Sequence, residues 1–198
     1  MFYEVIMKKF LISGTIIAGL FVYFFTTLVI FPQEYLSHKV IEPQPIQTVT
    51  LSVDDISLGE SFKISIEIQN KNDVADILIT SVAFPGLQEI EDNVKIFSYD
   101  YTQSPRYIVP GNKINSKYTS GGTIIAQYPS IEAYSRNVAA DTAYQMTLDI
   151  TPKNAGTFEM YIKTIAIPHT TALSHYPYQG LLDSQSEYVS VFTVNVNP

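Results

Sequence analysis

An uncharged run of 22 residues, Phe10 to Phe31, constrains this chain more than any other feature. As an α-helix it would extend about 33 Å, at roughly 1.5 Å per residue, which suffices for the roughly 30 Å hydrocarbon core of a bilayer. It is longer than the apolar core of a secretory signal and runs to Pro32 without a small-x-small cleavage pattern. We therefore expect an uncleaved transmembrane helix over residues 10–31.

The basic residues beside this run predict its orientation. Lys8 and Lys9 precede it directly, whereas the first basic residue after it is Lys39. Positive charge beside a span is retained on the cytoplasmic side. We expect a single-pass protein of the cell membrane, with residues 1–9 in the cytoplasm and the C-terminal part outside it.

Small residues recur within the run. Gly14 and Ala18 form one small-xxx-small pair, and Thr15 and Gly19 form a second. Such pairs let another membrane helix approach closely, although glycine and alanine are common in membrane helices without this role. Gly14, Ala18 and Gly19 are the candidate helix-packing residues.

The composition beyond the run excludes several classes of protein. Residues 32–198 hold 10 Lys and Arg against 18 Asp and Glu, a formal charge of 10 − 18 = −8, with the cations scattered singly. A nucleic-acid partner would require a basic patch. The chain contains no cysteine, so disulfides and cysteine-based metal sites or nucleophiles are excluded.

The remaining chain divides into a stalk and one domain. Pro32, Pro43 and Pro45 predict a stiff, partly extended stalk over residues 32–47, because proline fixes φ and disfavours helix. Residues 48–198 suffice for one extracytoplasmic domain. Alternating apolar and polar residues predict strands there. They cover residues 48–53, 62–69, 77–84, 94–99, 123–128, 144–151, 157–167 and 188–196.

Three details of these strands are also predicted. The apolar positions change phase late in residues 157–167, which indicates a bulge near Thr164. Residues 188–196 are apolar on both faces, which is typical of a strand that is central or covered on both sides. A helical turn is conceivable only near Ile131–Arg136. Seven to eight strands separated by Gly, Pro, Asn and Asp turns favour an all-β fold, an antiparallel β-sandwich.

Two stretches resemble a known class of domain. The loop, glycine, alternating strand and asparagine turn of Val53–Asn70 resemble the opening of immunoglobulin-like and CARDB-like domains on bacterial and archaeal surface proteins. Asn154-Ala155-Gly156-Thr157-Phe158 resembles the turn that enters a late immunoglobulin-type strand. Phe158 departs from that pattern because it lacks the hydroxyl of a tyrosine corner. The resemblance implies an immunoglobulin-like sandwich.

The same resemblance suggests what the chain does. A single N-terminal span with an outer sandwich is similar to archaeal cell-envelope proteins, archaellum stator-type subunits among them. We expect a non-catalytic, membrane-anchored domain that binds another envelope protein. The alternative is an accessory single-span subunit of a larger membrane enzyme or motor complex.

Catalytic and metal-binding motifs are scarce in the sequence. His38, His169 and His175 have no recognised ligand spacing, and the acidic groups at residues 54–60 and 89–92 lack an EF-hand pattern. No nucleophile-elbow, zinc-protease or phosphate-loop motif is present. We therefore expect no enzyme, no metal, no cofactor and no small-molecule substrate.

Tyrosine-rich connections are the candidate partner surface. Residues 100–141 and 167–187 are long for sandwich connections, and tyrosines supply apolar area and a hydroxyl at small entropic cost. Packing of the same rings over the sandwich is the competing interpretation. The candidate partner-binding residues are Tyr101, Arg106, Tyr107, Tyr118, Tyr176 and Tyr178.

Overall fold

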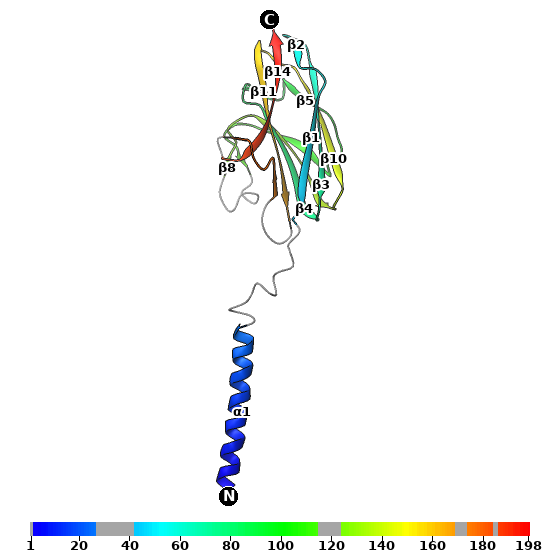
Figure 1. The fold of residues 1–198 in the computed structure, drawn as a ribbon. Coiled ribbons are helices and arrows are strands. Elements are labelled where there is room, and N and C mark those ends of the chain that lie inside the picture. Colours follow the sequence, from blue (N-terminus) through cyan, green and yellow to red (C-terminus); the bar gives the residue numbers. More distant parts are fainter. Residues whose placement is uncertain (1, 27–41, 115–123, 169–173, 184–185) are drawn as a thin grey trace. The chain divides into compact units, whose positions relative to one another are not determined.

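The computed structural model describes residues 2–26, 42–114, 124–168, 174–183 and 186–198. The chain divides into two compact units, residues 1–41 and residues 42–198. The first unit contains helix α1 (Phe2–Phe25), and the second contains the strands (Figure 1).

Helix α1 differs from the expected helix at its start. It begins at Phe2 and continues through Lys8 and Lys9, ahead of the start expected at Phe10. No proline interrupts this stretch, and a helix therefore extends through the two lysines without a break. Residues 27–31 of the expected span and most of the expected stalk lie outside the described residues. Across the described part of the chain, no helix has the length and apolarity that a membrane crossing requires.

The second unit is a sandwich of two main sheets. The smaller sheet has the strand order β1 (Gln44–Leu51), β3 (Phe62–Lys71), β10 (Ala143–Ile150) and β5 (Val94–Tyr99). The larger sheet has the order β13 (Leu181–Leu182), β14 (Tyr188–Asn197), β11 (Gly156–Ile167), β4 (Ala75–Ala83), β9 (Ser130–Val138) and β6 (Gln103–Ile108).

Short strands complete the larger sheet and a hairpin. Strand β12 (Ser174–Tyr176) pairs with β11, and β2 (Asp55–Ser57) pairs in parallel with β14. Strands β7 (Lys113–Ile114) and β8 (Ile124–Ile125) pair with each other. Of the strand expected over residues 123–128, the described residues 124–128 form a strand only at Ile124–Ile125.

The strand order confirms an immunoglobulin-like fold. A constant-type immunoglobulin sandwich has strands A, B, E and D in one sheet and G, F and C in the other. Strands β1, β3, β4, β5, β10, β11 and β14, taken in chain order as A to G, reproduce both sheets. Strands β6 and β9 are inserted between the fourth and fifth of these and extend the larger sheet beyond β4.

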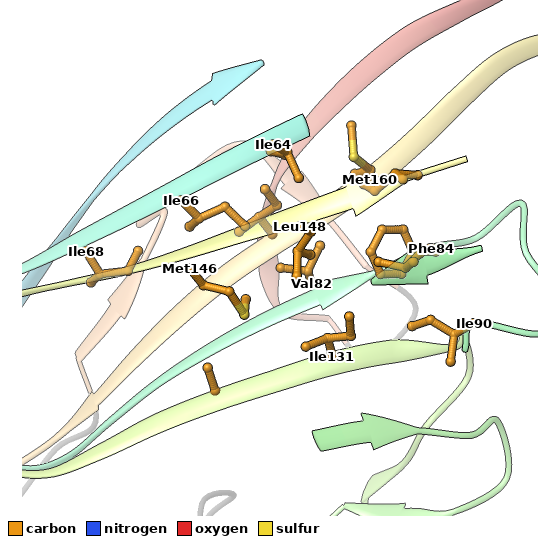
Figure 2. Packing of buried hydrophobic residues seen from close by; sticks show 14 of the residues in the cluster. Ile64, Ile66, Ile68, Val82, Phe84, Ile90, Ile131, Met146, Leu148 and Met160 are labelled. Carbon is orange, nitrogen blue, oxygen red and sulfur yellow. The ribbon is translucent and has the colours of Figure 1, made fainter. Parts of the chain in front are cut away.

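The core lies between the sheets and follows from the alternating sequence. In β3, Phe62, Ile64, Ile66 and Ile68 are buried while the residues between them face outward. Side chains from β3 and β10 meet those from β4, β9 and β11 across the interior (Figure 2). Phe158 packs edge-on against Phe62, with ring centroids 5.9 Å apart.

Three expectations about the strands are wrong. The helical turn near Ile131–Arg136 is instead strand β9, paired on both sides. Strand β1 begins at Gln44, inside the expected stalk. Strand β11 pairs with β4 from Tyr161 to Ile167 without a register shift, so no bulge occurs there at Thr164. Thr164 keeps its inward position because its Oγ1 donates to Gln47 Oε1 at 3.2 Å.

Candidate functional site

Tyr101 lies in the core, contrary to the expectation that it contacts a partner. Only 4% of its surface is exposed, and its ring stacks on Tyr144 with centroids 5.4 Å apart. Its Oη shares a hydrogen bond of 2.7 Å with Thr80 Oγ1. Burial raises the pKa of Tyr101 well above its ordinary value of 10.0. A buried hydroxyl is tolerated because the threonine satisfies it.

Tyr107 and Arg106 are neighbours on β6 with different roles. The Tyr107 hydroxyl donates to Val94 O on β5 at 3.0 Å, so this side chain joins the edges of the two sheets. Arg106 is exposed, and its Nη2 lies 2.7 Å from Glu132 Oε2 on β9. Tyr107 is therefore largely a packing residue, while the Arg106 guanidinium remains at the surface.

The six predicted residues do not form one surface. Tyr176 and Tyr178 lie at the end of β12, where their rings meet edge-on at 6.2 Å. Strands β11, β4 and β9 separate β12 from β6, a distance of roughly 19 Å at the usual strand spacing. Tyr118 lies outside the described residues. Arg106 and the Tyr176–Tyr178 pair thus lie at opposite edges of the larger sheet.

The connection from β12 to β14 carries the most exposed apolar surface near these tyrosines. Exposure is 51% for Tyr178, 63% for Leu181, 57% for Leu182 and 40% for Tyr188. Leu182 pairs with Tyr188 across the β13–β14 hairpin, and Leu181 pairs with Val189. We refer to Tyr178, Leu181, Leu182 and Tyr188 as the leucine surface.

Charged residues hold this hairpin in place. Lys163 on β11 pairs with Glu187 and lies 3.6 Å from Asp183 Oδ2, and all three side chains are largely buried. The Asp183 amide donates to Glu187 O at 2.8 Å, and the Glu187 amide donates to Asp183 Oδ1 at 3.0 Å. The two exposed leucines therefore lie on a hairpin that ion pairs and hydrogen bonds hold in place.

Tyr178 also approaches the start of the domain. Its pKa is raised, chiefly by burial, with smaller contributions from the nearby negative charge of Glu42 and from Tyr176. A hydrogen bond to Gln44 acts in the opposite direction.

The candidate helix residues belong to the other unit. Gly14, Ala18 and Gly19 are exposed on α1. Apart from the neighbouring residues and the nearby helix backbone, no heavy atom of the described residues lies within 4 Å of the position a Cβ would take on either glycine. The apolar side chains from Ile16 to Phe25 are exposed as well. Helix packing at these residues stays a prediction.

Metal ligands do not gather in the described part of the chain, where no group of three His, Cys, Asp or Glu residues is arranged to hold an ion. His175 is half-buried on β12, whereas His38 and His169 lie outside the described ranges. A cleft of about 230 Å³ lies beside the acidic group at residues 89–92. Its lining comprises Gln88, Glu89, Ile90, Glu91, Asp92, Val109, Pro110 and Pro129.

Sequence reasoning missed Leu181, Leu182 and Tyr188. Two adjacent leucines between Gly180 and Asp183 in an otherwise polar connection are the signal that could have indicated them. Their exposure follows from the short pairing of β13, which no local pattern reveals.

Comparisons with known proteins give weak similarity of fold only. No protein-family model and no curated protein matches the chain. A CARDB domain from Pyrococcus furiosus, solved with two metal ions, is 10% identical, with 81% of this chain and 98% of that chain covered and a TM-score of 0.39. An uncharacterised immunoglobulin-like protein from Nocardia farcinica is 11% identical, with 74% and 97% covered and a TM-score of 0.40. A protein that catalyses macrocyclisation in alchivemycin A biosynthesis is 7% identical, with 78% and 89% covered and a TM-score of 0.42.

Proposed function

We propose that this protein is a non-catalytic, membrane-anchored extracytoplasmic immunoglobulin-like domain that binds another protein of the cell envelope. The observation that carries the proposal is the leucine surface. Four large apolar side chains stand exposed on a hairpin that ion pairs and hydrogen bonds fix in place. Leu182 and Tyr188 are cross-strand partners on one face of the hairpin, and Leu181 is exposed on its other face. Exposed apolar side chains gathered on one element in this way are typical of protein contact sites.

The geometry of the leucine surface suits a protein partner more than a small molecule. Ligand sites are concave and enclose most of their ligand, whereas Leu181 and Leu182 project from a strand at the edge of a sheet. Tyr178 and Tyr188 add aromatic rings, which are enriched where binding energy concentrates in protein interfaces.

The anchoring part of the proposal rests on the uncharged run Phe10–Phe31 and on its helical backbone as far as Phe25. The exposed apolar side chains from Ile16 to Phe25 would be covered by lipid or by other helices. Lys8 and Lys9 favour a cytoplasmic N-terminus.

The alternative is an accessory single-span subunit of a larger membrane enzyme or motor complex, such as an archaellum stator-type assembly. The open faces of Gly14 and Gly19 favour it, because nothing in the described residues covers them. Replacing both with leucine would block close helix contact. Membrane subunits that co-purify with the wild type and are lost from this variant would support the alternative.

Site-specific photo-crosslinking in intact cells tests the main proposal. A crosslinking residue at exposed Gln179 is expected to yield one discrete product. The double variant Leu181→Ser and Leu182→Ser should lose that product. Phe97→Ser is the matched control, since Phe97 is equally exposed but lies on β5 of the other sheet. An unchanged product in the double variant would contradict the proposal.

A further inference from the structure

Strand β14 has an unpaired stretch along one edge. Strand β11 pairs with it from Ser190 to Val196, which fills its first edge. On the second edge, β13 reaches only Tyr188 and Val189. Strand β2, which lies beside the C-terminal end of β14 (Figure 1), reaches only residues 195–197. Among the described residues, no strand pairs with residues 190–194 on this side. The expectation of a central strand therefore holds for the edge of β14 that faces β11, and only in part for the other edge.

The open stretch presents backbone hydrogen-bonding groups. The Asn195 amide donates to Asp54 O, and Asn197 O accepts from Leu58 N, so both residues direct their backbone groups toward the second edge. Strand residues alternate in this respect. The N–H and C=O groups of Val191 and Thr193 consequently face the same edge, between β13 and β2.

The surroundings of the open stretch define what can occupy it. At one end lie exposed Leu182 and Tyr188, which belong to the leucine surface. At the other end lie exposed Asp54 and Asp55, while Glu159 on β11 pairs with Thr193. An occupant should therefore be apolar toward β13, and either uncharged or basic toward β2.

A second copy of this chain does not fit the open stretch. If two β14 strands paired antiparallel about Phe192, Asn195 of each would lie opposite Val189 of the other. Strand β13 already occupies that place beside Val189, and β2 occupies the place beside Asn195. A separate extended segment of up to five residues, about 17 Å long, has no such conflict.

We propose that residues 190–194 of β14 bind, by strand addition, an extended apolar segment of the partner protein that carries a basic rather than an acidic residue at its β2 end. This inference rests on the proposed function and specifies the chemistry of the partner. Main-chain hydrogen bonds to an open sheet edge provide affinity in such complexes, and side-chain contacts provide specificity.

Hydrogen exchange of the full chain in detergent micelles tests the edge directly. The Val191 and Thr193 amides should exchange fast, whereas the Phe192 and Val194 amides, which face β11, should be protected. The probe is a synthetic pentapeptide of alternating valine and threonine that ends in lysine. Saturating probe should slow exchange at Val191 and Thr193 by about tenfold.

Two altered peptides serve as controls for the probe. A twin with N-methyl groups on alternate amides cannot pair with a strand, and a twin with glutamate in place of lysine meets the carboxylates of Asp54 and Asp55. Both should leave exchange at Val191 and Thr193 nearly unchanged. Equal protection by the methylated twin, or no protection by any peptide, would overturn the proposal.

Two variants at one position test the edge in cells. Val191→Pro removes an N–H that faces the open edge and leaves the pairing with β11 in place. Val191→Thr keeps the N–H and changes only the side chain. With a crosslinking residue at Thr193, the proline variant should lose the partner product and the threonine variant should keep it. Protected Phe192 and Val194 amides show that each variant is folded.

The reporter at Gln179 separates the two proposals. A product from Gln179, together with a Thr193 product that Val191→Pro does not reduce, leaves the binding function standing and overturns strand addition. The absence of any product at both positions overturns the proposed function, and strand addition to an envelope partner falls with it.

Discussion

At the scale of single residues, burial decides which of the tyrosines can meet a partner. Tyr101 and Tyr107 follow one another closely in an apparently loop-like sequence, yet one lies in the core and the other joins two strands. In each case a nearby oxygen forms a hydrogen bond with the tyrosine hydroxyl. The partner is Thr80 Oγ1 for Tyr101 and Val94 O for Tyr107. Tyrosine content alone therefore does not identify a contact surface.

Replacing Tyr101 with phenylalanine should destabilise the domain at neutral pH. The change leaves the ring in place but deprives the buried Thr80 hydroxyl of its partner. An unsatisfied buried hydroxyl costs about 1–3 kcal/mol in the free energy of unfolding. Urea unfolding near pH 7 measures this difference.

The same variant should alter the response to alkali. Because burial raises the pKa of folded Tyr101 above 10.0, the unfolded chain loses this proton first as the pH rises. The stability that the buried, protonated Tyr101 contributes is fully present below the pKa that this tyrosine has in the unfolded chain. Above that pKa it declines, by up to about 1.4 kcal/mol per pH unit. Tyr101→Phe should thus lose less stability between about pH 8 and about pH 11 than the wild type. Equal losses of stability in the variant and the wild type would contradict the raised pKa of Tyr101.

At the scale of elements, predictability depends on whether a strand has one polar face. Strands β3 and β10 alternate strictly and were predicted to within two residues of their bounds. Strand β9 was missed because Glu132, Ser135 and Arg136 interrupt its apolar pattern. Glu132 is nevertheless largely buried, since Arg106 on β6 pairs with it. The contact that explains this strand comes from a residue far away in the sequence.

Removing the arginine from this pair should cost stability. Arg106→Ala deprives the largely buried Glu132 carboxylate of the guanidinium, and the expected loss is about 1–3 kcal/mol in the free energy of unfolding. Adding Glu132→Gln removes the charge and should restore most of this loss. Chemical denaturation of both variants measures the effect. If the double variant is as unstable as Arg106→Ala, the pairing of charges is not what stabilises β6 on β9.

At the scale of the whole molecule, the sequence predicted the class of fold better than the site. The immunoglobulin-like strand order follows from strands that alternation reveals. Strands β6 and β9 instead belong to an additional segment between β5 and β10, which contains Pro105 and Glu132. The exposure of Leu181 and the open edge at Val191 depend on where β13 and β2 end. Such endpoints are properties of tertiary pairing, which a single sequence does not specify locally.

The division into two units predicts that residues 42–198 fold without residues 1–41. Among the described residues, all strands and the buried hydrophobic cluster belong to this part, and its strands pair with one another. Thermal unfolding of the fragment should match that of the full chain to within about 4 °C, because no core contact is lost. A fragment without a cooperative transition would show that the sandwich depends on the first unit.

The same fragment tests the role of the first unit by comparison with the full chain. If the apolar run anchors the protein, the full chain should enter the detergent-rich phase of a cloud-point separation and the fragment should stay in the aqueous phase. Ile17→Lys with Phe21→Lys places two charges within the run, each of which costs about 2.5–3.5 kcal/mol in a membrane helix. This variant should move the full chain toward the aqueous phase while its thermal unfolding is unchanged. If the full chain without these charges stays in the aqueous phase, the apolar run does not anchor the protein. The sandwich, with its leucine surface and open edge, would then be a binding domain without a membrane anchor.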